Sequence, residues 1–263
     1  MLRDNRLKRA LNQGIETFGL LVSMPCAASI ELIGEAGFDF VVIDTEHVLI
    51  NPETLEHMIR TAESYGLTPL VRVPDADPKR ILRLLDAGAQ GIVLPQVETP
   101  ETVQAAVQAC KYAPEGTRSL NAGRPGAFGR DALSEYVTRA NAEIMVVAMI
   151  ETADGVEHID RITAVPGLDL ILEGAADLSQ SLGVTWQPNH PRVVEALAHV
   201  ADRARTAGVP YCAFLRGDDA LPAWRARGAT AFMLGDERGI AFRALTHALT
   251  HARSTQGTPR HAD

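Results

Sequence analysis

The chain has 263 residues, of which 46% are hydrophobic and 22% charged, and its formal net charge is −8. This composition is typical of a globular protein with a sizeable core, and the length suits one large domain. The negative charge argues against nucleic acid as the main partner, because phosphate binding needs a cationic surface. The first dozen residues are polar, and no stretch of roughly 18 apolar residues occurs, so we expect neither a signal peptide nor a membrane span. Three widely spaced cysteines fit a reducing compartment, so we expect a cytoplasmic protein.

A recurring pattern organises the chain: a glycine ends a helical stretch, and a short apolar run follows within a few residues. Glycine suits the left-handed residue that closes a helix, and all-apolar runs are typical of parallel strands covered on both faces. Two further runs lack the glycine but read as strands. The sequence therefore predicts eight strands, at 17–23, 40–43, 70–71, 92–94, 144–150, 170–172, 211–214 and 231–234.

Helical periodicity fills most of the intervals, at 52–65, 78–87, 100–111 and 191–207, and again from 241 onward. Strands that alternate with helices in this way indicate a parallel α/β fold. We predict a single (β/α)₈ barrel over residues 1–253, followed by a polar, disordered tail at 254–263. An open doubly wound sheet is the alternative, but no Gly-x-Gly-x-x-Gly motif follows the first strand.

Polar residues follow several of the predicted strands, where a (β/α)₈ barrel carries its reactive groups. No serine or cysteine sits in a nucleophile elbow, and no lysine ends a strand to form a Schiff base. What remains is a divalent cation held by carboxylates, together with an acid–base group. Glu151 and Asp177 are the candidate ligands, since Mg²⁺ and Mn²⁺ prefer carboxylate oxygen. The alternative is that each is a helix cap or a surface charge.

The segment 117–130 is loop-like and carries Arg118, Arg124 and Arg130 without any carboxylate. Long loops in compact barrels are often functional. We expect this one to be functional, because its charge opposes that of the rest of the chain. The alternative is a solvated loop.

Four segments carry a resemblance that covers roughly residues 7–249. They are GFDFVVIDTEH at 37–47, LLDAGAQG at 84–91, IET at 150–152 and GAADLS at 174–179. In this order they resemble the HpcH/HpaI aldolases, which are class II metal-dependent pyruvate aldolases. The resemblance implies a barrel enzyme that makes or breaks a carbon–carbon bond next to a 2-oxo acid, such as pyruvate or oxaloacetate.

The resemblance also implies roles for individual residues. Glu151 and Asp177 correspond to the two ligands of a divalent metal ion (Mg²⁺, Mn²⁺ or Co²⁺). His47 corresponds to the acid–base residue, and Arg72 to the cation that stabilises an enolate oxygen. The remaining correspondences are Asp44 and Asp86 as carboxylates that orient His47 and its surroundings, and Gly174, Ala175 and Ala176 as the seat of the substrate carboxylate. Hexamers that exchange the last helix, here 241–249, are also implied.

The sequence departs from the family pattern at two site positions. Met149 stands where typical members have glutamine, and Ala175 where many have proline. The runs 171–183 and 234–239 look instead like the siderophore citrate synthases of the staphyloferrin B type within the same family. That branch implies a second hypothesis, in which oxaloacetate condenses with acetyl-CoA in a Claisen-type reaction. Arg124 would then bind the second carboxylate of oxaloacetate through two parallel hydrogen bonds. A non-catalytic binding barrel is the third.

Overall fold

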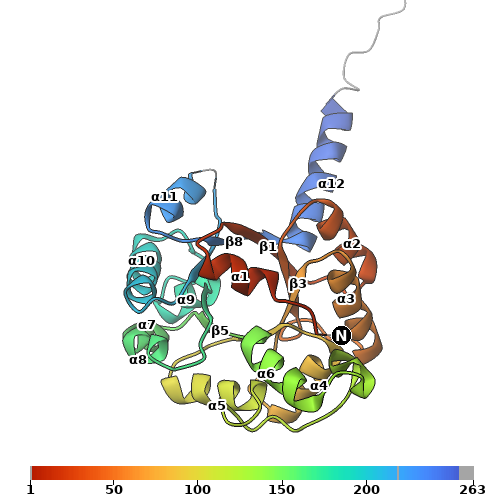
Figure 1. Ribbon diagram of the computed structural model, residues 1–263. Helices are drawn as coiled ribbons and strands as arrows, with labels where there is room; N and C mark the ends of the chain where they lie inside the picture. Colours follow the sequence, from red (N-terminus) through yellow and green to blue (C-terminus); the bar gives the residue numbers. More distant parts are fainter. Residues whose placement is uncertain (1, 218, 255–263) are drawn as a thin grey trace, which may run out of the picture.

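Eight parallel strands close into one barrel in the computed structural model, which describes residues 2–217 and 219–254. Each strand pairs with the next in chain order, and the last pairs with the first (Figure 1). This confirms the predicted (β/α)₈ barrel. The strands are β1 (Thr17–Val22), β2 (Phe40–Asp44), β3 (Thr68–Arg72), β4 (Gly91–Leu94), β5 (Met145–Ile150), β6 (Leu170–Glu173), β7 (Tyr211–Phe214) and β8 (Ala231–Asp236).

Helices surround the barrel, and four of them start as the sequence predicts, with proline in the first turn. The side chain just before each of these prolines caps the helix by accepting a backbone N–H, as proline-led helices commonly require. The helices are α1 (Arg6–Asn12), α2 (Ala27–Glu35), α3 (Pro52–Ser64), α4 (Pro78–Ala87), α5 (Pro100–Cys110), the 3₁₀ turn η1 (Arg124–Gly129), α6 (Leu133–Glu143), α7 (Ala153–Glu157), α8 (Ile159–Thr163), α9 (Ala175–Ser181), α10 (Pro191–Thr206), α11 (Ala220–Ala226) and α12 (Glu237–Ser254).

The six glycines that define the recurring pattern adopt left-handed backbone conformations. Their φ values run from 74° to 113°, which side chains with a Cβ adopt only with strain. Five of them lie at the C-cap of a helix or directly after it, so they are the helix stops that the sequence indicates: Gly37, Gly66, Gly88, Gly208 and Gly228. Gly167 differs, because α8 ends at Thr163 and Gly167 lies in the turn before β6.

Two apolar cores lie on opposite sides of the barrel wall. The larger fills the space between the strands and the surrounding helices. The smaller fills the barrel itself with every second strand residue, such as Phe40 and Val42 of β2. Helix α1 closes the N-terminal end of the barrel, because Leu7 and Leu11 belong to this inner core (Figure 1). The other end is left for polar side chains.

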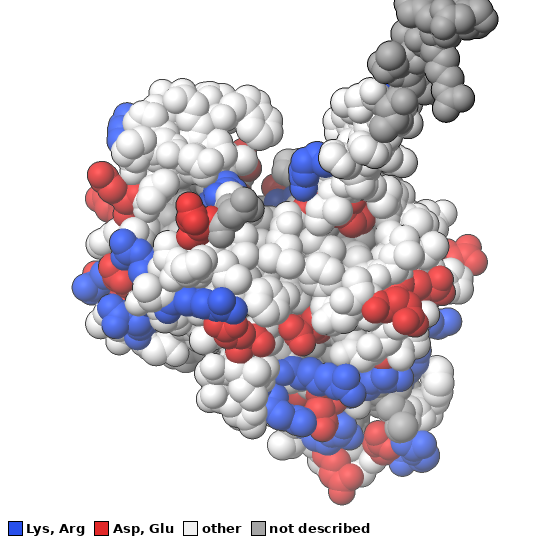
Figure 2. All heavy atoms as spheres, turned by 90° about the horizontal axis from the view of Figure 1, so that it is seen from above, with Lys and Arg blue, Asp and Glu red and all other residues white. Residues whose placement is uncertain are grey.

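Helix α12 leaves the body of the barrel and projects away from it (Figures 1 and 2). Its first residue, Glu237, is tied to the loop after β1, since its carboxylate accepts the backbone N–H groups of Ser23 and Met24. The helix includes Ser254, the first residue of the predicted tail. The expectation of disorder concerns 255–263, which lie outside the described residues.

Candidate active site

The alternation of side chains along the strands determines which polar groups reach the open mouth. Successive strand residues point to opposite faces, so the inward series Phe40 and Val42 continues to Asp44. In the same way Leu70 leads to Arg72, and Met149 leads to Glu151. These three charged residues are all buried, with 2%, 6% and 1% of their surface exposed for Asp44, Arg72 and Glu151. They therefore form the polar top layer of the barrel interior.

Arg72 is held by two carboxylates. Its Nε lies 3.0 Å from Asp44 Oδ1 and its Nη2 lies 2.9 Å from Asp44 Oδ2, a two-bond fork that fixes the guanidinium plane. Its Nη1 lies 3.2 Å from Glu46 Oε2 and 3.8 Å from the sulfur of Met149. Burial opposes the charge on Arg72, but the hydrogen bond and charge of Asp44, with the charges of Glu46 and Glu151, outweigh it and raise its pKa.

Glu46 joins the site although no role was predicted for it. Its side chain is only 13% exposed and also lies near His47, whose Nε2 is 3.6 Å from Oε2. Burial raises the pKa of Glu46; Arg72 and His47 oppose this shift, and Asp44 and Asp177 add to it. The signal in the sequence is its place in the Asp-Thr-Glu-His run after β2, between two residues with predicted roles.

Glu151 has one oxygen satisfied and one without a partner. Its Oε1 accepts the backbone N–H of Gln96 at 2.7 Å, whereas its Oε2 is buried and has no hydrogen-bond partner. Burial raises the pKa of Glu151 to about 7; the Gln96 hydrogen bond and Arg72 oppose the shift, and the charges of Asp177 and Glu46 reinforce it. A buried carboxylate oxygen with no partner costs free energy, so this position suits a bound cation.

Asp177 lies in the first turn of α9, directly after β6. Its charge contributes to the raised pKa of both Glu151 and Glu46, as expected for carboxylates that follow neighbouring strands at one end of the barrel. Within the described residues no group of three or more His, Cys, Asp or Glu side chains is arranged as a metal site. A pair of carboxylates fits the open sites of Mg²⁺ and Mn²⁺, which keep several positions for water or substrate.

His47 follows β2 and is exposed, with 64% of its side chain accessible. Asp44 holds the backbone of this loop, since its Oδ1 lies 3.1 Å from the amide nitrogen of Glu46 and 3.4 Å from that of His47. The imidazole itself lies near Glu46. The expected orienting effect of Asp44 therefore acts on the loop that carries the ring rather than on the ring itself.

Asp86 and Arg124 do not lie at this mouth, contrary to prediction. Asp86 is in the last turn of α4, which leads to the start of β4, and it accepts from Arg118 at 2.7 Å and from Asn121 at 3.1 Å. Arg124 forms two hydrogen bonds, of 2.7 and 2.9 Å, with the carboxylate of Glu63. Both residues are used in holding the segment 117–130 against α3 and α4.

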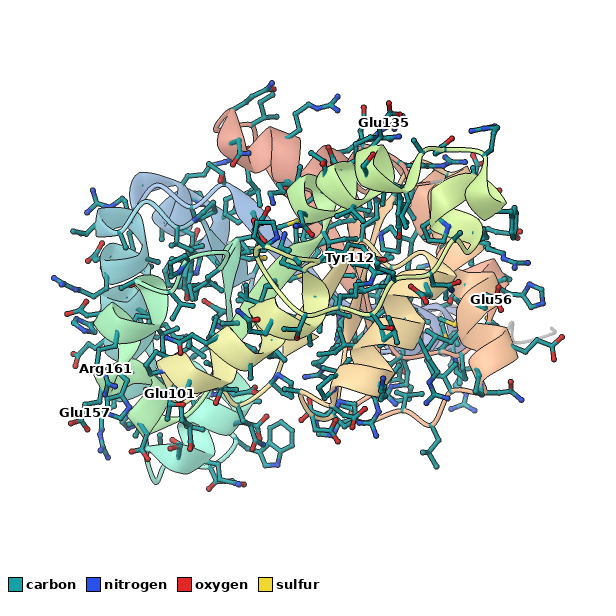
Figure 3. All side chains as sticks on the ribbon, turned by 60° about the horizontal axis from the view of Figure 1, so that its bottom comes forward. Glu56, Glu101, Tyr112, Glu135, Glu157 and Arg161 are labelled. Carbon is teal, nitrogen blue, oxygen red and sulfur yellow. The ribbon has the colours of Figure 1, made fainter. Side chains whose placement is uncertain are left out.

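The three arginines of the segment 117–130 thus form ion pairs with carboxylates of this chain. Arg118 is buried and also stacks on the ring of Tyr112, 4.7 Å from its centroid. Tyr112 is labelled in Figure 3 and is itself buried. Arg130 pairs with Asp131 at 3.0 Å. The ion pairs therefore give these arginines a structural role, and substrate binding by the segment 117–130 stays a prediction.

Gly174 packs directly against Glu151, and this contact explains its lack of a side chain. A Cβ at this position would lie 2.3 Å from Oε2 and 2.5 Å from Cβ of Glu151. The backbone N–H of Gly174 donates to the carbonyl of Ile150 at 3.0 Å, which fixes the spacing of β5 and β6. Ala175 and Ala176 then open α9, where first-turn N–H groups have no acceptor within the helix.

We predict that Gly174→Ala displaces the Glu151 carboxylate. Overpacking of this kind costs about 1–3 kcal/mol, and the shift moves the oxygen that a cation would need. Thermal unfolding should show the loss of stability, and calorimetric metal titration should show weaker binding. Gly126→Ala is the matched control, since its Cβ would meet the Tyr136 ring at an ordinary 3.6 Å. Metal affinity equal to that of the unmodified protein would contradict the prediction.

A second buried network supports β6 from the outside of the barrel. Glu173 is fully buried, accepts a 2.6 Å hydrogen bond from the Tyr211 hydroxyl, and is also paired with Arg216. Burial raises the pKa of Glu173, and Arg216 and Tyr211 oppose the shift. This network links the end of β6 to β7 and to the loop after it, immediately before the Gly174 turn.

Carboxylates and one arginine at the C-terminal mouth of a (β/α)₈ barrel define a class of protein: a barrel enzyme whose chemistry is electrostatic and suited to a divalent cation. The family model described as "HpcH/HpaI aldolase/citrate lyase" matches residues 17–244. The chain belongs to this family, so it is an enzyme of the class II aldolase type, in a family of metal-dependent enzymes.

Named relatives cover nearly the whole chain. A hydroxypyruvate/pyruvate aldolase of Sagittula stellata is 37% identical over 87% of this chain and 90% of its own length. A 5-keto-4-deoxy-D-glucarate aldolase of Shigella dysenteriae is 33% identical over 93% of this chain and 95% of its own. Among solved structures, the citrate synthase SbnG is 43% identical, with a TM-score of 0.89, over 95% of this chain and 98% of that one. The expected family is thereby confirmed.

Proposed function

We propose that this enzyme makes or breaks the carbon–carbon bond beside the keto group of a 2-oxo acid, pyruvate or oxaloacetate. The observation that carries the proposal is the unpartnered, buried Oε2 of Glu151, in a mouth that also contains Asp177 and Arg72. Glu151 and Asp177 would hold Mg²⁺, Mn²⁺ or Co²⁺. When bound, such an ion supplies a Lewis acid for the keto oxygen.

The side chains of this chain supply the other functions. Arg72, fixed by Asp44, presents a positive charge where negative charge develops on the enolate oxygen. His47 is exposed at the mouth and would exchange the proton, because an imidazole can both donate and accept one. The N–H groups of Ala175 and Ala176, with Gly174 leaving room, would hold the substrate carboxylate. Arg124 has no part in this scheme, because Glu63 occupies it.

A second function, Claisen-type citrate synthesis from oxaloacetate and acetyl-CoA, is favoured by the 43% identity to the citrate synthase SbnG. The two functions differ in their co-substrate. Incubation with Mg²⁺, oxaloacetate and acetyl-CoA, followed by a free-thiol assay, tests the synthase. Thiol release with citrate formed would exclude a simple aldolase. Pyruvate-dependent consumption of a hydroxyaldehyde without thiol release would exclude the synthase, and no turnover in either assay would reject both.

The enzyme also presents a surface suited to self-association. Phe242, Leu245 and Leu249 of α12 are 71%, 72% and 52% exposed, and their spacing places them on one face of the helix. The projecting helix shows mostly uncharged surface in Figure 2. Within the described residues no helix is long and apolar enough to cross a membrane. We therefore propose that α12 packs on a second copy, within the hexamer that the family resemblance implies.

We predict that Phe242→Glu with Leu245→Glu dissociates the assembly. Burial of each large apolar side chain stabilises the interface by about 1.5–3 kcal/mol. Two glutamates in their place remove this contribution and add charges that burial in an interface disfavours. Light scattering coupled to size exclusion should report a smaller mass. His247→Glu, on the opposite side of the helix, is the control and should leave the mass unchanged. A monomeric wild type would rule out the proposed assembly.

A further inference from the structure

A polar cavity of about 340 Å³ lies at the opposite end of the barrel from the candidate active site. It is bounded by the N-terminal arm and α1, the turn between α3 and β3, and one residue of α6. These are the elements around the N-terminal ends of the strands, where α1 crosses the barrel (Figure 1). A volume of this order can hold a small ligand. The proposed function assigns nothing to this cavity.

Four arginines line the cavity: Arg3, Arg6, Arg9 and Arg139. Of these, Arg9 pairs with Asp4 at 2.8 Å. The other acidic residue of the lining, Glu63, has both carboxylate oxygens bonded to Arg124. In the part of the chain that the structure describes, Arg3, Arg6 and Arg139 thus have no carboxylate partner. They stand together in a protein whose formal net charge is −8.

Backbone carbonyls are the partners of these three guanidinium groups. Arg3 donates to the carbonyl of Glu63, Arg6 to that of Gly66 at 3.5 Å, and Arg139 to that of Leu2 at 3.1 Å. A guanidinium has five N–H donors, so one carbonyl leaves most of them available. Positive charges collected around one cavity repel each other unless an anion lies between them. Their donors and charge therefore suit an anionic ligand.

The arm that carries Arg3 is held rigidly. The side-chain amide of Gln90 donates to the carbonyl of Arg3 at 2.9 Å, and the carbonyl of Gln90 accepts from Asn5 at 3.1 Å. Asn5 and Gln90 are 1% and 4% exposed. The amide of Leu2 donates to the carbonyl of Pro125 at 2.6 Å. The backbone that carries Arg3 is therefore fixed before a ligand binds, which lowers the entropy cost of binding, although the arginine side chains themselves are exposed.

We propose that this cavity binds a small multivalent anion, with two or more phosphate or carboxylate groups that Arg3, Arg6 and Arg139 contact together. Arginine recognises both groups through paired N–H···O bonds, and two or more anionic groups match three guanidinium groups better than one does. Such a ligand connects the arm, α6 and the α3–β3 turn, and it stabilises the folded state by mass action.

Isothermal titration of metal-free enzyme with pyrophosphate and with citrate tests the proposal and separates the two chemical sources. At least one should bind with a dissociation constant below the millimolar range. Arg6→Gln with Arg139→Gln should weaken that binding about tenfold or more, the effect of losing one or two charge-assisted hydrogen bonds. Arg161→Gln, an outer-surface arginine labelled in Figure 3 that pairs with Glu101 at 3.4 Å, is the control and should bind as wild type does.

Three results would overturn the proposal. The first is that neither pyrophosphate nor citrate binds. The second is that the double variant binds the anion as tightly as wild type does. The third is that sulfate at equal ionic strength gives the same heat and the same thermal shift. If citrate still binds the double variant as tightly as wild type, its binding site is the active-site mouth, and this result counts against the cavity. Arg6→Gln alone guards against misfolding, because Arg6 is exposed and its guanidinium forms, among the described residues, only a long hydrogen bond of 3.5 Å to the Gly66 carbonyl. Turnover measured on the same variants keeps this result separate from the proposed function.

Discussion

Glu151→Gln is expected to lower kcat/KM by about 10³-fold or more, since a catalytic metal contributes several kcal/mol and about 4 kcal/mol equals that factor. The amide keeps the size of the side chain and can still accept the Gln96 N–H at the position of Oε1. It removes the negative charge from the buried Oε2, which has no protein partner. Steady-state kinetics with added Mg²⁺ or Mn²⁺ measures the loss, and calorimetry should show weaker metal binding.

The fold of this variant should remain intact. Burial raises the pKa of Glu151 to about 7, so its charged form destabilises the metal-free fold at higher pH. A neutral amide removes that penalty, and the melting temperature of the metal-free variant at pH 8 should equal or exceed that of wild type. Glu157→Gln makes the same chemical change on the outer surface and should alter neither property (Figure 3). An active variant that chelators do not inhibit would defeat the metal assignment.

The sequence predicted those features that local pattern determines. Helix-stopping glycines such as Gly88 precede apolar strands, and both signals lie within a few residues of each other. The alternation along β5 also carries inward-pointing Met149 to Glu151 without knowledge of any other strand. Because all parallel strands end at one mouth, such local patterns were enough to bring Asp44, Arg72 and Glu151 together.

Features that depend on distant partners could not be predicted in this way. The charge of the segment 117–130 suggested a substrate site, but its meaning depends on Glu63, which meets Arg124 from 61 residues away. Asp86 similarly finds Arg118 and Asn121, 32 and 35 residues further on. A single sequence shows each charged residue but not which distant residue pairs with it. The ion pairs of these arginines therefore could not be predicted from the sequence.

Short helices were also missed where polar residues dominate. In α1, Leu7 and Leu11 face the inner core. Two apolar residues four positions apart in a charged segment are a weak signal for a helix. Helix α6 buries Tyr136, Ala140 and Asn141 beside a long loop. Packing against the barrel rather than intrinsic propensity stabilises such elements, so periodicity alone identifies them poorly.

Arg72→Lys is expected to lower kcat by about 10²–10³-fold, the usual cost of losing a preorganised donor at a developing negative charge. Arg72 uses a planar fork, with Nε and Nη2 on Asp44 and Nη1 beside Glu46. An ammonium is a point charge on a flexible chain and cannot meet both carboxylates with this geometry. The positive charge survives, so a loss of activity would measure geometry rather than charge.

Whether the loss falls on kcat or on KM distinguishes stabilisation of the transition state by Arg72 from simple substrate binding. Charge on the substrate oxygen develops in the transition state, so the loss should appear mainly in kcat, with KM little changed. Arg161→Lys on the outer surface is the matched control. Asp44→Asn should weaken the same fork, and the double variant should be less impaired than the product of the two single effects, because both act through one guanidinium position. A loss confined to KM, or two fully independent effects, would show that Arg72 binds substrate without stabilising the developing charge.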